Sequence, residues 1–136
     1  MKFQFKQENQ LTQADLFMLY NSVGWTSYTK DLAKLQRAVA NSQAVITVWL
    51  RAELVGLIRT IGDQETILYI ENLLVKPEYQ HQGLGTELIQ QVLKRNSGIR
   101  QVVLLTDNTV KTRAFYEKQG LTNIDKLGIV AFYQEY

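Results

Sequence analysis

A short glycine-bearing loop at residues 80–86 has the residue types and spacing best suited to chemistry. It reads Gln80-His81-Gln82-Gly83-Leu84-Gly85-Thr86 and joins an apolar run ending at Val75 to an amphipathic segment beginning near Thr86. Glycines at such a junction let the backbone reach positive φ and approach a bound group closely. The unpaired N–H groups and the dipole of a helix start favour an anion, most often phosphate. These residues therefore predict a phosphate-bearing ligand at 80–86.

The residues around the two glycines distinguish between the known classes of phosphate-binding loop. A nucleotide P-loop ends in Gly-Lys-Ser/Thr, whereas Gly85 is followed by Thr86-Glu87. The dinucleotide fingerprint needs a third glycine where this chain has Leu88. The pattern Gln80-x-x-Gly83-x-Gly85, after a strand-like run and a proline, instead resembles the acyl-CoA loop of the GNAT superfamily of N-acetyltransferases. That resemblance implies acetyl-CoA as the co-substrate.

A second stretch, Ala114 to Leu121, also resembles this family. Its letters Phe-Tyr-Glu-Lys-Gln-Gly-Leu are similar to the Phe-Tyr-Glu-Lys-x-Gly-Phe common near the carboxyl end of GNAT members, and they depart only at Leu121. In that family the tyrosine often protonates the departing CoA thiolate, which makes Tyr116 the candidate general acid. A phenol with a pKa of about 10 can give a proton to such a thiolate. The alternative is that Phe115 and Tyr116 only pack their helix against the sheet.

Glu71 is the candidate general base. It lies in a strand-like run, Leu68 to Val75, that is otherwise mostly apolar. A buried carboxylate is costly unless it is paired, and an amine acceptor must lose a proton before it attacks, directly or through water. The resemblance adds that GNAT enzymes often have an acidic residue near this position. The alternative is that Glu71 faces solvent or pairs with Arg59 on the neighbouring strand.

The resemblance also implies the residues that hold the cofactor. In the family, the main chain of the strand before the loop hydrogen-bonds the pantetheine arm, and the next parallel strand separates from it. The loop has no permanent cation, so backbone N–H groups must bind the pyrophosphate, while His81 is either a donor or an exposed loop residue. Asn108 and Thr109 are candidates for the pantetheine contact, with capping of the next helix as the alternative for Asn108. The predicted cofactor-binding residues are Leu73, Leu74, Val75, Gln80, His81, Gln82, Gly83, Leu84, Gly85, Thr86, Asn108 and Thr109.

The sequence indicates less about the acceptor-binding residues than about any other part of the site. Trp25 and Tyr28 lie in a connection between two predicted helices that, in the family, flank the acceptor cleft. Aromatic side chains there could stack on or enclose an amine. They are equally well explained as core anchors, and the acceptor itself is not identified.

Hydrophobic periodicity supplies the elements that must position these residues. Thr12 has the pattern of a helix N-cap with Asp15 three residues later. Short turns between apolar runs predict an antiparallel meander, and a helical crossover after Val75 predicts a parallel pair. The predicted strands are 2–6, 44–50, 54–61, 66–75, 101–105, 121–124 and 128–132, and the predicted helices follow Thr12, Tyr28, Gly85 and Thr109. We therefore expect an α/β, GNAT-like fold: a mixed, mostly antiparallel, twisted sheet of six to seven strands flanked by about four helices.

Composition bounds the remaining possibilities. The chain has 136 residues, which suits a single domain spanning 1–136. With no cysteine and one histidine, we expect neither a metal site nor a cysteine nucleophile. The net charge of +2 comes from scattered residues, so nucleic acid is not an expected partner. No apolar run approaches a membrane span, and we expect a cytoplasmic protein. The carboxyl-terminal residues 131–136 could pair, as part of a hairpin, across a homodimer.

Together these features predict an acetyl-CoA-dependent N-acetyltransferase. The acetyl group would pass to a primary amine by direct attack in a ternary complex, since no cysteine exists to carry an acyl-enzyme. Serine or another nucleophile as the acyl carrier is the alternative. The competing hypothesis is a CoA-binding sensor or partner module without catalysis. Such a module would keep the two loop glycines but would need neither Tyr116 nor Glu71.

Overall fold

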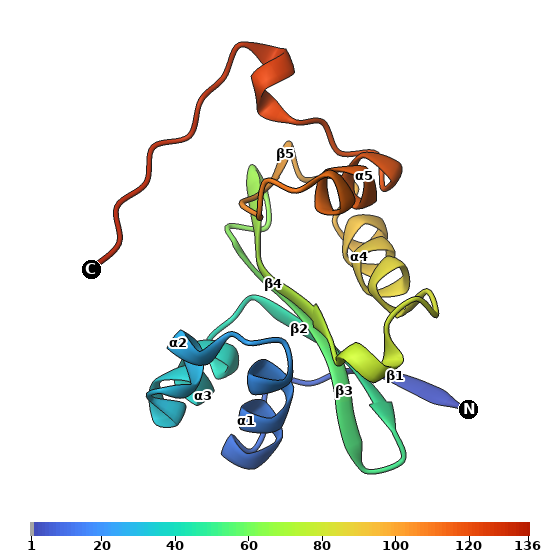
Figure 1. Cartoon of the computed structure of the whole chain (residues 1–136). Coiled ribbons are helices and arrows are strands. Elements are labelled where there is room, and N and C mark those ends of the chain that lie inside the picture. Colours follow the sequence, from blue (N-terminus) through green and yellow to red (C-terminus); the bar gives the residue numbers. More distant parts are fainter. Residues whose placement is uncertain (1) are drawn as a thin grey trace. The chain divides into compact units, whose positions relative to one another are not determined.

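The computed structural model describes residues 2–136, which form two compact units. The first unit ends at Leu105 and contains the sheet, and the second is Thr106–Tyr136. The strands are β1 (Phe3–Gln7), β2 (Ala44–Leu50), β3 (Glu53–Gly62), β4 (Ile67–Val75) and β5 (Gln101–Leu104) (Figure 1). The helices are α1 (Gln13–Ser22), α2 (Thr26–Thr29), α3 (Leu32–Ala40), α4 (Leu84–Arg95) and α5 (Val110–Lys118), with 3-10 helices η1 (Pro77–Tyr79) and η2 (Ile124–Leu127).

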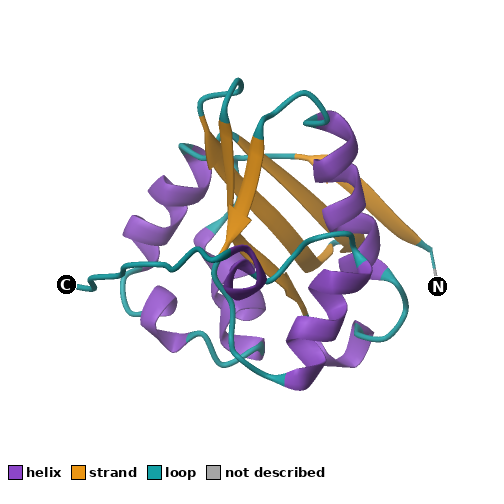
Figure 2. Cartoon of the chain, turned by 90° about the horizontal axis from the view of Figure 1, so that it is seen from above, coloured by secondary structure: helices purple, strands orange, loops and turns teal. Residues whose placement is uncertain are grey.

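The sheet follows the order of the chain, β1-β2-β3-β4-β5. Figure 2 shows its strands lying side by side. The first four strands pair antiparallel, and β5 pairs parallel to β4. The prediction of a meander followed by a parallel pair is therefore confirmed. Because α4 connects β4 to β5, the loop that precedes α4 lies beyond the carboxyl end of β4, where open α/β sheets bind ligands.

Helices α1, α2 and α3 lie on one side of the sheet and α4 lies on the other (Figure 1). Thr12 caps α1 as predicted, because its hydroxyl accepts a hydrogen bond from the Asp15 N–H at 3.1 Å. Short α2 forms within the stretch predicted to be a connection between two helices. The core beneath α1 and α3 contains Leu11, Leu16, Leu19, Tyr20, Leu35, Val39, Val45, Leu54, Leu57 and Leu74.

The prediction of six to seven strands is wrong, since the structure forms five among residues 2–136. Residues 121–124 and 128–132 are not strands, and no hairpin forms there. Asn123 instead caps η2, because its side-chain oxygen accepts from the Asp125 N–H. Gly128 ends η2 with φ +71°. These local hydrogen bonds offer the backbone an alternative to strand pairing.

Gly56 allows β3 to approach the end of β4 closely. A Cβ atom at this position would lie 2.9 Å from the Leu74 carbonyl oxygen and 2.9 Å from Val48 Cγ1. Because a backbone oxygen cannot rotate away, we expect Gly56→Ala to lower the free energy of unfolding by about 1–3 kcal/mol. Chemical denaturation measures this loss. Gly98→Ala is the control, because nothing lies within 4 Å of a Cβ there, and equal midpoints for both variants would contradict the prediction.

Candidate active site

Within residues 2–136, the carboxyl-terminal half of β4 has a strand neighbour on one side only. Pairing with β5 runs from Ile67 to Ile70 and stops there, opposite Leu104. On its other side β4 stays paired with β3 as far as Val75. The sheet therefore opens along residues 71–75, on the edge where a ligand can replace the missing strand. Leu73, Leu74 and Val75, the predicted backbone contacts of the cofactor, lie on this open edge.

A set of polar contacts holds the chain where it leaves β4. Lys76, which is 6% exposed, donates a 2.8 Å hydrogen bond to Glu53 Oε2 in an ion pair. The Tyr79 hydroxyl, from η1, donates to the other carboxylate oxygen at 3.2 Å. Hydrogen bonding to Lys76 lowers the pKa of the Glu53 carboxyl. The Gln80 side-chain amide donates to the Val75 carbonyl oxygen at 2.9 Å, so this predicted cofactor residue also anchors the loop to the strand.

The loop becomes a helix at Gly83, which is the N-cap of α4 and has φ +82°. Helix α4 begins at Leu84, two residues before the predicted start near Thr86. Of the two loop glycines, Gly83 has the left-handed backbone, which glycine adopts without steric cost. His81 is also left-handed, at φ +65°. The first-turn N–H groups of a helix have no acceptor within the helix, so the start of α4 presents donors suited to an anion.

Glu71 is paired with two side chains that come from other elements. Tyr28, in α2, donates a hydrogen bond to Glu71 Oε1 at 3.2 Å, and Arg59 Nη2 lies 4.0 Å from the same oxygen. The Arg59 side chain is 6% exposed and that of Glu71 is 30% exposed. The contact with Arg59, one of the two alternatives to a base role, is therefore present. Because the carboxylate remains partly open to solvent, the pairing leaves room for a proton-accepting role.

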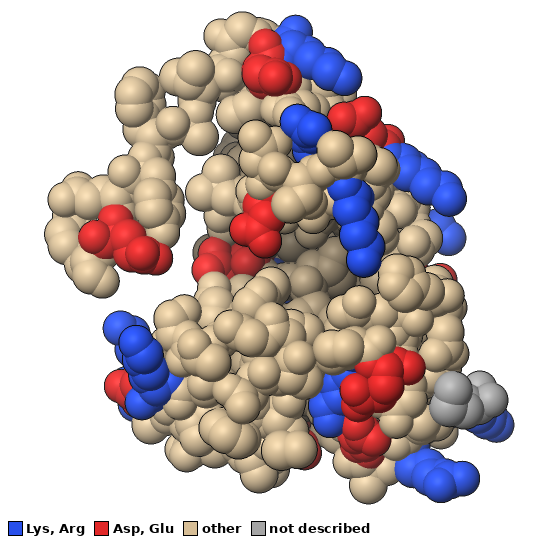
Figure 3. Space-filling model, viewed as in Figure 1, with Lys and Arg blue, Asp and Glu red and all other residues tan. Residues whose placement is uncertain are grey.

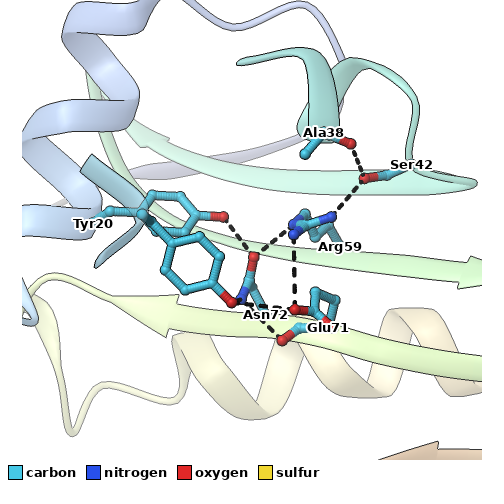
Figure 4. A network of polar contacts seen from close by, with 7 residues as sticks. Tyr20, Ala38, Ser42, Arg59, Glu71 and Asn72 are labelled. Carbon is cyan, nitrogen blue, oxygen red and sulfur yellow. Dashed lines mark hydrogen bonds and ion pairs between the residues drawn. The ribbon is translucent and has the colours of Figure 1, made fainter. Parts of the chain in front are cut away.

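Asn72 is the centre of this network and was not singled out from sequence (Figure 4). Its side-chain oxygen accepts from the Tyr20 hydroxyl at 2.9 Å and from Arg59 Nε at 2.6 Å. Its amide nitrogen donates to the Tyr28 hydroxyl at 3.0 Å and to the Glu71 carbonyl at 2.9 Å. Asn72 is 3% exposed. The available signal was an asparagine inside an apolar strand, which must find partners when it is buried.

The predicted acceptor residues lie in an aromatic cluster next to this network. The Trp25 and Tyr28 ring centroids are 6.0 Å apart, and those of Tyr20 and Tyr28 are 5.2 Å apart. Trp25 and Tyr28 pack partly buried against the core. Burial raises the pKa of both the Tyr20 and the Tyr28 phenol. Both hydroxyls therefore keep their protons at neutral pH, which lets Tyr28 donate to Glu71.

The second compact unit contains the remaining predicted site residues. Tyr116 lies in α5, where its ring meets that of Phe115 edge to face at 5.0 Å, and desolvation raises the pKa of its phenol. Thr109, not Asn108, is the N-cap of α5, because its hydroxyl accepts from the Thr112 N–H at 3.1 Å. Asn108 instead accepts from Arg113 Nη1 at 3.1 Å. The proposed capping role of Asn108 is therefore wrong.

Among residues 2–136, no group of three or more His, Asp or Glu side chains is placed to hold a metal ion. No helix in this part of the chain is long and apolar enough to cross a membrane. On the face shown in Figure 3, basic and acidic side chains are interspersed.

Comparison with known proteins identifies what this chain resembles. Residues 11–121 match the Acetyltransferase (GNAT) family model. An N-acetyltransferase described as ycf52-like, from Prochlorococcus marinus, is 34% identical over 96% of this chain and 74% of its own length. A histone acetyltransferase from Glycine max is 30% identical over 78% of this chain, but the match spans only 50% of that protein. A solved GNAT acetyltransferase from Streptococcus pneumoniae has a TM-score of 0.88 and 27% identity, covering 99% of this chain and 98% of that one.

Proposed function

The chain belongs to the Acetyltransferase (GNAT) family of N-acetyltransferases, and from that premise we propose that it moves an acetyl group from acetyl-CoA to a primary amine by direct attack in a ternary complex. The observation that carries this proposal is the end of β4–β5 pairing at Ile70. It leaves the edge of residues 71–75 open on the strand that leads, through residues 76–82, to the glycine-capped start of α4. We propose that residues 1–136 act as one such domain, and its cytoplasmic location stays a prediction.

Acetyl-CoA is proposed to bind along this open edge. Residues 80–86, with the first turn of α4, bind the pyrophosphate through backbone N–H groups. The main chain of Leu73, Leu74 and Val75 takes the place of the missing strand and hydrogen-bonds the pantetheine arm. A main-chain N–H on this edge also polarises the thioester carbonyl and stabilises the oxyanion that forms on attack. Asn108 or Thr109 adds a further contact to the pantetheine.

The proposed chemistry needs one base and one acid. Glu71 removes a proton from the ammonium of the acceptor, directly or through water, and the free amine attacks the thioester carbon. The tetrahedral intermediate collapses, the carbon–sulfur bond breaks, and Tyr116 gives its proton to the thiolate of CoA. The nitrogen, which still carries an extra proton after the attack, releases it to solvent to give the neutral amide, and Tyr116 takes up a proton from solvent. Trp25 and Tyr28 line the acceptor side, where aromatic faces attract a cationic amine. Tyr28 also orients Glu71 through its hydrogen bond.

Calorimetric titration with acetyl-CoA tests the cofactor site. We expect the intact protein to bind with a Kd in the micromolar range, about −8 kcal/mol. We expect Gly83→Val to weaken binding at least about tenfold, which is about 1.4 kcal/mol, because a branched side chain obstructs the loop and resists positive φ.

Gly24→Val is the matched control for that titration. Gly24 has φ +78°, close to the +82° of Gly83, and neither position has an atom within 4 Å of a Cβ. Both substitutions therefore carry a similar backbone cost, while only one lies in the loop. Equal weakening in both variants, or no binding by the intact protein, would overturn the assignment of residues 80–86.

A further inference from the structure

The orientation of the buried Asn72 amide is fixed by a neighbour that can only donate hydrogen bonds. An arginine side chain has no acceptor, and Arg59 Nε donates to the Asn72 side-chain oxygen at 2.6 Å (Figure 4). Rotating the amide by half a turn would set its N–H groups against the Arg59 Nε–H. The amide nitrogen of Asn72 therefore faces the Tyr28 hydroxyl, to which it donates at 3.0 Å.

This orientation decides where the hydroxyl proton of Tyr28 goes. A phenol hydroxyl has a single proton to donate. Because Asn72 already donates to the Tyr28 oxygen, that proton is directed away from Asn72 and toward Glu71 Oε1, which lies 3.2 Å from the Tyr28 oxygen. The donors therefore follow one another from Arg59 through Asn72 and Tyr28, and the last of them donates to the Glu71 carboxylate.

The other end of this series is fixed by the helix layer. Arg59 Nη1 donates to the Ser42 hydroxyl at 3.3 Å, and that hydroxyl donates to the Ala38 carbonyl oxygen of α3 at 2.9 Å (Figure 4). Both Arg59 and Asn72 are buried. Because buried polar groups are costly to leave unpaired, each donor is bound to the acceptor that it has in the structure.

We propose that Asn72 is a positioning residue for the general base: it directs the Tyr28 hydroxyl proton to Glu71 Oε1, so that Oε2 takes the proton of the acceptor amine. This inference rests on the base role proposed for Glu71. The contacts of the carboxylate with Tyr28 and with Arg59 both go to Oε1. A carboxylate held by one oxygen keeps the other at a fixed place, and such placement of a reacting group contributes to the rate.

Asn72→Asp tests this role, because it keeps the shape of the side chain and the acceptor for Arg59 but removes the donor to Tyr28. The Tyr28 proton then turns to the new carboxylate and leaves Glu71. We expect kcat to fall about tenfold, which is the order of one hydrogen bond to a charged group. The KM for acetyl-CoA should stay the same. A merely structural role would leave the kcat of the folded protein unchanged.

Asn72→Leu removes the same donor without adding a charge. It is expected to lower kcat by a similar factor, and also to lower the free energy of unfolding, because Arg59 and Tyr20 lose their acceptor. Circular dichroism gives the folded fraction of each variant, so that kcat refers to folded protein. A fall in kcat for Asn72→Asp alone would assign the effect to the added charge and overturn the proposal.

A double-mutant cycle shows whether Asn72 acts through Tyr28. Tyr28→Phe is expected to lower kcat about tenfold, and adding Asn72→Asp to it should lower kcat no further. Independent effects would multiply to about a hundredfold, and that result would contradict the proposal.

Tyr20→Phe is the matched control for Tyr28→Phe. The Tyr20 hydroxyl donates to the same Asn72 oxygen that Arg59 holds, but it is not one of the steps that lead to Glu71. The substitution should lower the free energy of unfolding and leave kcat unchanged. Equal falls in kcat for the two tyrosine variants would overturn the proposal, even where the Asn72 variants do not fold.

Glu71→Gln separates this inference from the base assignment on which it rests. An unchanged kcat in Glu71→Gln would remove the base role and the positioning role together. A lower kcat in Glu71→Gln beside an unchanged kcat in Asn72→Asp would overturn the positioning role alone. We expect both single variants to lose activity, and Asn72→Asp to change kcat by less than about twofold in the Glu71→Gln background, where no carboxylate remains to be positioned.

Discussion

Glu71→Gln is expected to lower kcat about 10²–10⁴-fold, the usual contribution of a general base, while acetyl-CoA binding stays unchanged. The carboxamide has the same shape as the carboxylate and can still accept the Tyr28 hydrogen bond. It cannot accept a proton from the ammonium group of the acceptor. Steady-state kinetics with a panel of primary amines, followed by CoA release, measures kcat, and calorimetry measures the binding of acetyl-CoA.

The alternative for Glu71 is that it serves only as the partner of Arg59. In that case Glu71→Gln would lower the free energy of unfolding, because the buried guanidinium loses its counter-charge, and kcat would stay near the value of the intact protein. Lower stability together with an unchanged kcat would contradict the assignment of Glu71 as the general base. Glu65→Gln is the control, since Glu65 is an exposed carboxylate in the turn before β4 and neither quantity should change there.

Tyr116→Phe is expected to lower kcat about 10²–10⁴-fold with little change in the Kd of acetyl-CoA. The substitution keeps the ring that contacts Phe115 and removes only the hydroxyl that protonates the leaving thiolate. Tyr136→Phe removes a hydroxyl from a fully exposed tyrosine and should leave kcat as it is. Unchanged turnover in Tyr116→Phe would leave this tyrosine with a packing role alone.

The pH profile offers a second measurement of the same role. Desolvation raises the pKa of Tyr116 above its ordinary value of about 10. Because the acid acts in its protonated form, a raised pKa extends activity to higher pH than an exposed tyrosine would. We therefore expect the alkaline decline of kcat in the intact protein to begin above about pH 10, and the Tyr116→Phe variant to lose that decline.

Features that depend on local signals were predictable from the sequence. The Thr12 cap, the antiparallel turns and the crossover helix after β4 each depend on residues close together in the chain, and the structure confirms them. The glycine loop belongs to the same group, because backbone freedom at Gly83 and a following amphipathic helix are both local properties. The start of α4 was wrong by two residues, since helix periodicity does not mark the capping residue sharply.

The prediction of two carboxyl-terminal strands was wrong because a strand-forming composition does not by itself supply a second strand to pair with. Residues 121–124 and 128–132 include apolar and β-branched side chains, which favour strands. A strand is stable, however, only when another strand completes its backbone hydrogen bonds. In this chain, the hydrogen bond to the Asn123 side chain and the left-handed Gly128 form a short 3-10 helix in place of strand pairing. Hydrophobic periodicity could not predict that these segments stay unpaired, because it indicates which side chains share a buried face and not which strand lies next to them.

By itself, the sequence determined the family, and it marked residues 80–86 as the candidate cofactor loop and Glu71 and Tyr116 as candidate acid–base groups, since each is carried by a short motif. Only the tertiary structure decided what surrounds Glu71. Tyr28 lies 43 positions away from it in the chain, and Tyr20 lies 52 positions from Asn72. The fold also decided that β5 leaves β4 after Ile70. These contacts join distant segments, and their geometry depends on how helices and strands pack, which no local pattern of residues encodes.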